Sequence, residues 1–248
     1  MIKKLILLVW PVTCAGCNVV DQEVCPKCKL KLQEYISPTV VVKDDVEVYS
    51  GSNYQDTMRK LLLKWKDHGR LDLDRVMCKI VRQVAIKFFN SECKKFLNRR
   101  LTSGRNKIIV VPCPSSRSSV KKRTRLQTLS LALAVASELK KLGVPAQVKQ
   151  ILKQKNIKKQ VNFDSAQRAQ NKQNALYVVR RHRAPPQGKG VLADKTDCAK
   201  LLTANCERVV LVDDVCTTGA TFRASKLVLA SAGIDVVGCI ALSSTVLE

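Results

Sequence analysis

Apolar stretches of strand length recur along this 248-residue chain. Val209–Val212 has no polar face, which is typical of an inner strand of a parallel sheet that helices cover on both sides. Lys107–Pro114 predicts a second buried strand, which runs into a proline-stiffened turn. The alternating pattern of Val40–Val48 predicts another strand, and Val236–Leu242 predicts the last one.

Stretches with helical periodicity separate these strands. Met58, Leu61, Leu62 and Trp65 fall on one face of Tyr54–Lys66, which predicts an amphipathic helix. The other expected helical segments are Asp72–Leu97, Leu126–Lys141, Asn162–Asn174, Asp194–Leu202 and Phe222–Ala232. Alternation of strands and helices predicts an α/β fold with a doubly wound, mainly parallel sheet.

A turn rich in Thr and Gly follows the apolar run Val209–Val212 and two adjacent carboxylates. Ahead of a helix, its hydroxyls and backbone N–H groups suit a phosphate. The carboxylates would repel that phosphate, but they match the neighbouring 2′ and 3′ hydroxyls of a ribose. The alternative is a buried strand, an Asp-rich turn and an N-capped helix that bind nothing. The candidate ligand-binding residues are Asp213, Asp214, Val215, Cys216, Thr217, Thr218, Gly219, Ala220 and Thr221.

Two Cys-x-x-Cys pairs near the start of the chain predict a zinc site. A single pair is compatible with redox chemistry, but two pairs so close together favour a tetrahedral metal. Four thiolates leave zinc no open position, so its expected role is structural. We therefore expect a zinc-finger region at residues 1–40 and a main domain at residues 41–248. The expected ligands are Cys14, Cys17, Cys25 and Cys28.

The composition is strongly basic, with a formal charge of +24 and a pI near 9.8. Such a charge predicts attraction to polyanions, although a solubilising surface in a basic proteome explains it equally well. The cysteines outside the two pairs are scattered, as in a reducing cytosol. Leu5–Trp10 is too short for a signal peptide and no stretch resembles a membrane span, so we expect a cytoplasmic protein.

A basic loop between Pro114 and Leu126 forms a second candidate anion site, because it joins a buried strand to a helix. Arg117 and Arg123 are its candidate contacts, and an exposed basic loop without a ligand is the alternative. Between Lys140 and Lys189, thirteen Lys and Arg residues accompany one acid, Asp164. Within it, Lys153–Gln160 has little core character, which predicts either a flexible flap over a phosphorylated substrate or a nucleic-acid contact.

The segment 208–221 resembles the phosphoribosyl pyrophosphate (PRPP) motif of type I phosphoribosyltransferases. The whole chain resembles the ComF/GntX family of phosphoribosyltransferase-like proteins. In that family an aromatic residue and a proline precede a four-cysteine finger, as Trp10 and Pro11 do here. A tyrosine-led helix that ends in a lysine before a glycine is matched by Tyr54, Lys66 and Gly69.

Two further blocks of the family are matched in part. The Arg-Gly-Phe-Asn-Gln block that follows a Pro-x-Pro strand end falls on Arg123–Gln127, where the Arg and the Gln are kept and the Gly and Asn are lost. The Gln and Arg-x-x-Asn block falls on Gln160, Arg168 and Asn171. The PRPP segment itself is complete, so the resemblance supports PRPP binding more strongly than turnover.

The resemblance implies a Mg²⁺-dependent phosphoribosyltransferase that displaces pyrophosphate from PRPP with a nitrogen nucleophile. In that case Asp213 and Asp214 are the catalytic and ribose-binding pair. The implied pyrophosphate or acceptor contacts are Lys66, Arg117, Arg123, Gln127 and Gln160. On charge pattern alone, Lys66 is better explained by a solvated helix face.

The family is associated with natural competence and DNA uptake, which favours an alternative to the transferase hypothesis. In this alternative the protein catalyses no reaction, and it senses PRPP or binds single-stranded DNA or the DNA-uptake machinery. Aromatic residues make up only 4% of the chain, which argues against a surface dedicated to stacking bases. The sequence leaves the oligomeric state and the acceptor open.

Overall fold

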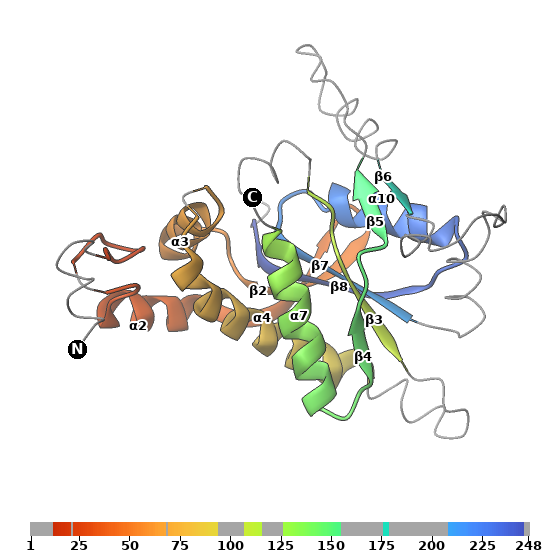
Figure 1. The fold of residues 1–248 in the computed structure, drawn as a ribbon, viewed down its shortest axis with the longest axis horizontal. Coiled ribbons are helices and arrows are strands. Elements are labelled where there is room, and N and C mark those ends of the chain that lie inside the picture. Colours follow the sequence, from red (N-terminus) through yellow and green to blue (C-terminus); the bar gives the residue numbers. More distant parts are fainter. Residues whose placement is uncertain are drawn as a thin grey trace, which may run out of the picture.

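The computed structural model describes residues 12–20, 22–67, 69–93, 107–115, 126–154, 176–178 and 208–245. In this part of the chain, helices cover both faces of a mostly parallel six-stranded sheet (Figure 1). The α/β class predicted from the apolar pattern is confirmed. No helix among the described residues is both long enough and apolar enough to cross a membrane.

Four parallel strands form one side of the sheet, and a β-hairpin completes the other. The order is β1-β2-β8-β7-β3-β4, with β1 and β2 antiparallel and all other pairs parallel. The strands are β1 (Ile36–Lys43), β2 (Val46–Ser52), β3 (Ile108–Pro112), β4 (Ala146–Val148), β7 (Arg208–Cys216) and β8 (Val236–Ser244). A separate antiparallel pair consists of β5 (Leu152–Gln154) and β6 (Leu176–Val178).

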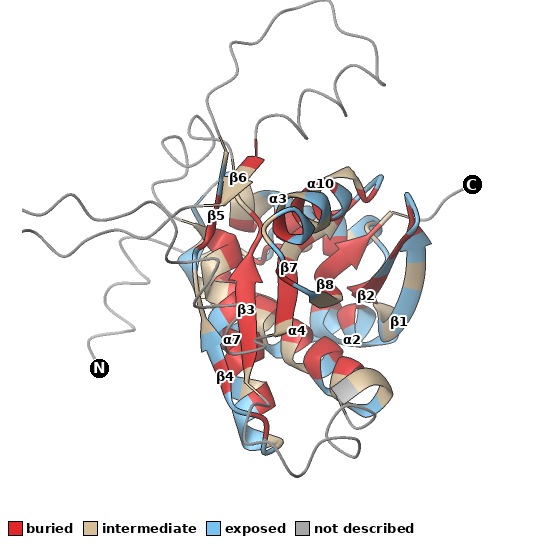
Figure 2. Cartoon of the chain, turned by 90° about the vertical axis from the view of Figure 1, so that its right-hand side faces the viewer, coloured by how far each residue is buried: buried red, intermediate tan, exposed pale blue. Residues whose placement is uncertain are grey.

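Alternate residues of the central strand β7 enter two cores. Val210 and Val212 belong to the core on the side of α3 (Asp56–Asp67), α4 (Asp74–Phe88) and α7 (Gln127–Lys141). Val209 and Leu211 belong to the opposite core, under α10 (Ala220–Ala230). Figure 2 shows β3 and β7 buried along most of their length, as expected of inner strands.

The other helical elements are short or follow directly on α4. They are α2 (Pro26–Tyr35), the 3₁₀ turn η1 (Leu71–Leu73) and the π turn η2 (Phe89–Cys93). The predicted helices at Tyr54–Lys66 and Leu126–Lys141 match α3 and α7 to within two residues. Those predicted at Asn162–Asn174 and Asp194–Leu202 lie outside the described residues.

The prediction of a single strand at Val40–Val48 is wrong. The chain turns at Asp44 and Asp45, which have positive φ values of 50° and 59°, and Lys43 pairs with Val46 across the turn. Aspartate tolerates the left-handed region better than most residues, so the pair closes the hairpin without the glycine that usually marks one. The division at residue 40 falls inside β1.

Strand β7 also continues four residues beyond the predicted run Val209–Val212. Asp213 pairs with Ala241, and Val215 pairs with Ser243, because β8 continues alongside as far as Ser244. On its other side β7 loses its neighbour, since β3 ends at Pro112 opposite Val212. The two carboxylates therefore lie within β7, at the point where one neighbouring strand has ended.

Helix α10 begins two residues before the predicted start at Phe222 and ends at Ala230. Gly233, at a φ of 72°, turns the chain there. The N–H groups of Gly233 and Ile234 bond back to the carbonyls of Ala230 and Leu229 at 2.9 and 3.0 Å. These bonds satisfy free carbonyls of the last turn and stop the helix.

Candidate functional site

Asp214 forms an ion pair with Lys66 at the carboxyl edge of the sheet. The distance between Lys66 Nζ and Asp214 Oδ1 is 2.7 Å, and the two side chains are 18% and 12% exposed. Lys66 lies in the last turn of α3, and Asp214 lies on β7. The charge pattern of α3 favoured a solvated lysine, whereas the structure turns Lys66 onto a strand carboxylate.

Gln127 holds the backbone of Lys66, the lysine of this ion pair. Its side-chain amide donates to the backbone carbonyl of Lys66, at 3.3 Å from Nε2 to O, and the residue is only 3% exposed. Three predicted site residues, Lys66, Gln127 and Asp214, thus come from three distant segments and are linked through one helix end. The other candidates, Arg117, Arg123 and Gln160, lie outside the described residues.

The two carboxylates also organise the backbone of the strand end. Asp213 Oδ1 accepts the N–H of Asp214 at 2.8 Å, and Asp214 Oδ1 accepts the N–H of Val215 at 2.7 Å. These contacts hold both carboxylates against the backbone of β7. Carboxylate oxygens are acceptors, so the pair suits a ligand with hydroxyl donors.

The loop after β7 leads directly into the N-terminus of α10. Thr217 and Thr218 are exposed, and Gly219 has a φ of 83° at the N-cap of the helix. Thr245 fixes the start of this loop, because its hydroxyl donates to the carbonyl of Thr217 at 3.0 Å and its N–H to that of Cys216 at 3.0 Å. Exposed hydroxyls and the first N–H groups of a helix suit an anion.

Glycine at position 219 is required for two reasons. A side chain would be strained at this φ, and a Cβ there would lie 2.5 Å from the carbonyl oxygen of Lys43. The loop therefore rests directly on the last residue of β1. Sequence patterns did not single out Lys43, because this contact joins residues that are far apart in the chain.

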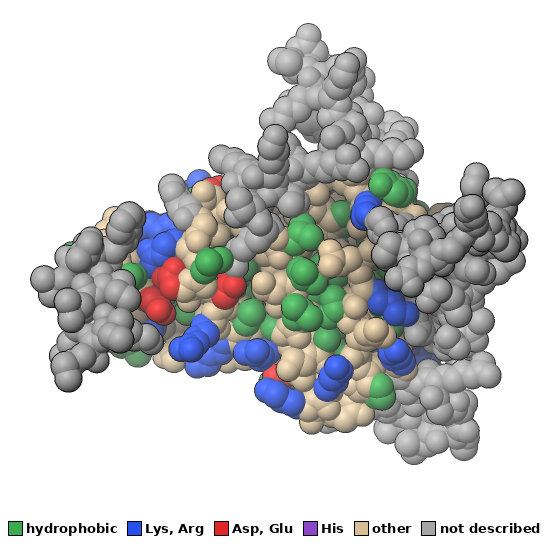
Figure 3. Space-filling model, viewed as in Figure 1, with side chains coloured by type: hydrophobic (Ala, Val, Ile, Leu, Met, Phe, Trp, Pro, Cys, Tyr) green, Lys and Arg blue, Asp and Glu red, His purple; other side chains and the backbone are tan. Residues whose placement is uncertain are grey.

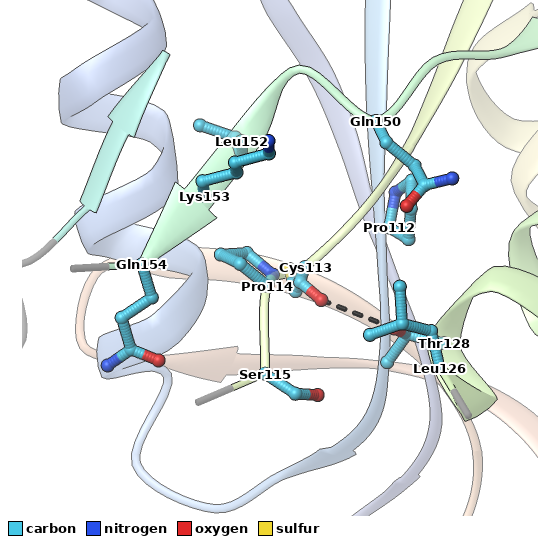
Figure 4. A pocket seen from close by; sticks show the side chains of 10 residues that line it. All are labelled: Pro112, Cys113, Pro114, Ser115, Leu126, Thr128, Gln150, Leu152, Lys153 and Gln154. Carbon is cyan, nitrogen blue, oxygen red and sulfur yellow. Dashed lines mark hydrogen bonds between the residues drawn. The ribbon is translucent and has the colours of Figure 1, made fainter. Parts of the chain in front are cut away.

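A cavity of about 380 Å³ lies one strand away from the carboxylates (Figure 4). Cys113, in its wall, donates its N–H to the carbonyl of Val212 at 2.8 Å, so the cavity wall adjoins β7 just before Asp213. Burial, followed by the charges of Asp213 and other neighbours, raises the pKa of the Cys113 thiol well above its usual range. The cavity is lined by Pro112, Cys113, Pro114, Ser115, Leu126, Thr128, Gln150, Leu152, Lys153 and Gln154.

The walls of this cavity differ in chemistry. Its floor is formed by the prolines and Cys113 at the end of β3, where Thr128 Oγ1 donates to the Cys113 carbonyl at 3.3 Å (Figure 4). Gln150 and Gln154 contribute amides from the segment that contains β5, and Lys153 adds a positive charge. Among the lining residues no carboxylate occurs. The volume and the mostly apolar lining are those of a small-molecule site.

The four predicted zinc ligands form one cluster beside α3. Their sulfurs all lie within 4.8 Å of one another, and those of Cys17 and Cys25 are 3.6 Å apart. Four thiolates about 2.3 Å from one zinc ion would be roughly 3.8 Å apart, so the arrangement fits a tetrahedral metal such as zinc. All four are free cysteines, and only Cys17 is exposed.

Local backbone geometry brings the two cysteine pairs together. Gly16 is needed because a Cβ there would lie 2.6 Å from the sulfur of Cys28. Cys25 is the N-cap of α2, Pro26 follows at the first helical position, and the N–H of Cys25 donates to the sulfur of Cys14 at 3.2 Å. These turns present N–H groups to sulfur, as metal knuckles do.

The electrostatics of the cluster call for a cation. Burial raises the pKa of Cys14, but N–H donors from Cys25, Cys17 and Gly16 outweigh it and the pKa falls to about 6. Burial and the neighbouring thiols raise the pKa of Cys28 to about 12. Four sulfurs this close can all ionise only if a positive ion lies between them.

Direct contacts join the cysteine cluster to α3. Lys64 Nζ donates to the side-chain oxygen of Asn18 and, at 3.5 Å, to the carbonyl of Cys14. Arg70, just after the helix, donates to the carbonyl of Thr13 at 2.9 Å. The helix that carries Lys66 to Asp214 is therefore attached at the same end to the cysteine knuckle.

No protein-family model matches this chain, and a comparison with curated proteins also gives no match. The resemblance to ComF/GntX proteins is therefore a prediction from the motifs.

We predict that Cys25→Ser lowers the zinc content of the purified protein, because one thiolate of the tetrahedron is lost. Cys78→Ser is the matched control, since Cys78 lies in α4 and its thiol contacts the carbonyl of Ser130. Metal analysis of both variants checks this prediction. Unchanged zinc in Cys25→Ser would contradict a four-cysteine site.

We predict that Gly219→Ala destabilises the protein more than Gly143→Ala. Both glycines have nearly the same φ, 83° and 82°, but nothing lies within 4 Å of a Cβ at Gly143. The left-handed conformation costs either alanine about 1–2 kcal/mol. Contact with Lys43 adds roughly 1–3 kcal/mol at position 219 only. Denaturant unfolding measures the difference, and equal losses would show that the loop does not press on β1.

Proposed function

We propose that this chain binds PRPP with Mg²⁺ at the carboxyl edge of its sheet and transfers the phosphoribosyl group to a nitrogen acceptor. The observation that carries this proposal is the position of Asp213 and Asp214. They lie where β3 has ended, between a lysine from α3 and the N-terminus of α10. Carboxylates beside an anion-binding helix end suit a ligand that carries both hydroxyls and phosphates.

Each part of the ligand has a corresponding part of the site. The exposed hydroxyls of Thr217 and Thr218 and the first N–H groups of α10 would hold the 5′-phosphate. The carboxylates of Asp213 and Asp214 would accept the ribose 2′ and 3′ hydroxyls. Lys66 would bind the pyrophosphate, exchanging Asp214 for the incoming anion.

The reaction follows from this placement. The acceptor nitrogen forms a bond to C1 of the ribose while the bond from C1 to the pyrophosphate oxygen breaks, and that electron pair leaves with pyrophosphate. The acceptor's proton passes to water. Positive charge develops at C1, close to the two carboxylates, which stabilise it. Mg²⁺, carried mainly by PRPP oxygens and water, would neutralise the leaving pyrophosphate.

The 380 Å³ cavity is the proposed acceptor site, because it adjoins the strand that carries the carboxylates. A planar nitrogen heterocycle would stack against its apolar floor and use the amides of Gln150 and Gln154 for its polar edges. Figure 3 shows Lys and Arg side chains among hydrophobic and other side chains on one face of the described residues. We favour a small acceptor over a nucleic acid because the cavity has the volume and the mostly apolar lining of a small-molecule site.

We predict that PRPP with Mg²⁺ binds the parent protein and that Asp213→Asn/Asp214→Asn abolishes measurable binding. An amide keeps the shape of the side chain but removes the charge that favours hydroxyl donors and Mg²⁺. Isothermal titration calorimetry gives both affinities, and Cys78→Ser serves as a folded control. If the parent protein does not bind PRPP, the proposed function is wrong.

We predict that Lys66→Met weakens PRPP binding at least about tenfold while changing ribose 5-phosphate binding little. A charge-assisted contact contributes about 1.5–3 kcal/mol, and only PRPP brings the pyrophosphate. Lys60→Met is the control, since Lys60 is an exposed lysine of the same helix. Equal losses for both ligands would place Lys66 outside the pyrophosphate site.

A further inference from the structure

Among the described residues, Lys43 is a buried lysine whose Nζ has no hydrogen-bond acceptor. The residue is 3% exposed. Lysine is almost never fully buried unless it is paired, because an unpaired ammonium loses its hydration without compensation. A group that costs this much stability needs another explanation.

The position of Lys43 points to the loop before α10. It is the last residue of β1, and its backbone carbonyl touches Gly219, the N-cap of that helix. The adjoining hairpin turn is docked on the same helix, since Arg223 Nη1 lies 2.9 Å from Asp44 Oδ1. This ion pair engages Asp44, the residue that follows Lys43 in the chain.

The charge of Lys43 acts on the residue at which this loop starts. Cys216, the last residue of β7, is 2% exposed and accepts the N–H of Gly219 at its sulfur. Burial and then the charge of Asp213 raise the pKa of this thiol to about 11, while that N–H and the charge of Lys43 act in the opposite direction. Lys43 therefore lies close to the loop that carries the exposed residues Thr217 and Thr218.

We propose that Lys43 and the N-terminal turn of α10 form one subsite for a phosphate monoester, in which the buried ammonium is neutralised by the phosphate of the ligand. The helix contributes N–H groups and the positive end of its dipole. Lys43 contributes a full charge that water hardly screens, because the medium beneath the loop has a low dielectric constant. The identity of the occupant, the 5′-phosphate of a phosphoribosyl ligand, rests on the proposed function.

The subsite is tested with ribose 5-phosphate and ribose in the absence of Mg²⁺. We expect the parent protein to bind the phosphate ester and not the free sugar. Lys43→Met keeps the length and shape of the stem and should weaken ribose 5-phosphate binding at least tenfold. Lys226→Met, which removes a charge from the same helix α10, should leave the affinity unchanged.

The melting temperature is a second measurement, and it distinguishes a ligand-binding lysine from one that only stabilises the fold. Without ligand, Lys43→Met should raise the melting temperature, since it removes an unpaired buried charge. Unchanged affinity for ribose 5-phosphate in Lys43→Met would overturn the proposal. A loss of folding in both Lys43→Met and Lys43→Gln would also overturn the proposal, because the charge of Lys43 would then be needed to stabilise the fold.

PRPP with Mg²⁺, titrated in parallel, separates this inference from the proposed function. If the parent protein binds PRPP and Lys43→Met binds it equally well, the subsite is wrong and the function stands. If ribose 5-phosphate binding depends on Lys43 but PRPP binds no better, the subsite stands and the function fails. If the parent protein binds neither ligand, both are wrong.

Discussion

The ion pair between Lys66 and Asp214 is the contact on which the geometry of the site depends. It connects the end of α3 to the end of β7, and Gln127 at the start of α7 holds the same lysine by its carbonyl. Two helices on one face of the sheet, α3 and α7, therefore meet at the strand end that carries Asp214. The Asp214 side chain is only 12% exposed and already pairs with Lys66. In the proposed function an incoming pyrophosphate would take the place of Asp214 at this lysine, which is the reason to assign Lys66 to the anionic part of the ligand.

The cysteine cluster belongs to the same arrangement, because it fixes the other attachments of α3. Lys64 and Arg70 bond to carbonyls at Cys14 and Thr13, close to the first thiolate. A metal ion that holds the four sulfurs would thereby restrain the backbone at Thr13 and Cys14, to which the end of α3 is bonded. The structural role predicted for zinc thus includes the positioning of Lys66, only two residues away from Lys64.

The sequence was most informative where one segment determines its own structure. The inner strands, the amphipathic helix α3 and the cysteine pairs were all predictable, because periodicity and spacing are local signals. The hairpin at Asp44 and Asp45 was missed because two aspartates adopt the conformation that glycine or asparagine usually signals. The full length of β7 was missed because its last pairs depend on β8, a strand that follows it in the chain.

The candidate site divides in the same way. Asp213, Asp214 and the loop after them were predictable as a continuous motif, whereas the contacts of Lys66 and Gln127 needed the fold. Lys43 carried no local signal, since only its packing against Gly219 makes it relevant.

The charges at this edge of the sheet bear on the need for Mg²⁺. Asp213 and Asp214 contribute two negative charges, and Lys66 and Lys43 contribute two positive ones, so these four side chains are balanced as a group. PRPP would add a 5′-phosphate and a pyrophosphate, and Lys43 and Lys66 cannot neutralise both while Asp213 and Asp214 stay ionised. The excess negative charge would have to be carried by a cation that arrives with the ligand. A divalent ion bound by the pyrophosphate oxygens satisfies that requirement without any dedicated protein ligand. For the proposed ligand PRPP, a magnesium dependence therefore agrees with the charges of these four side chains.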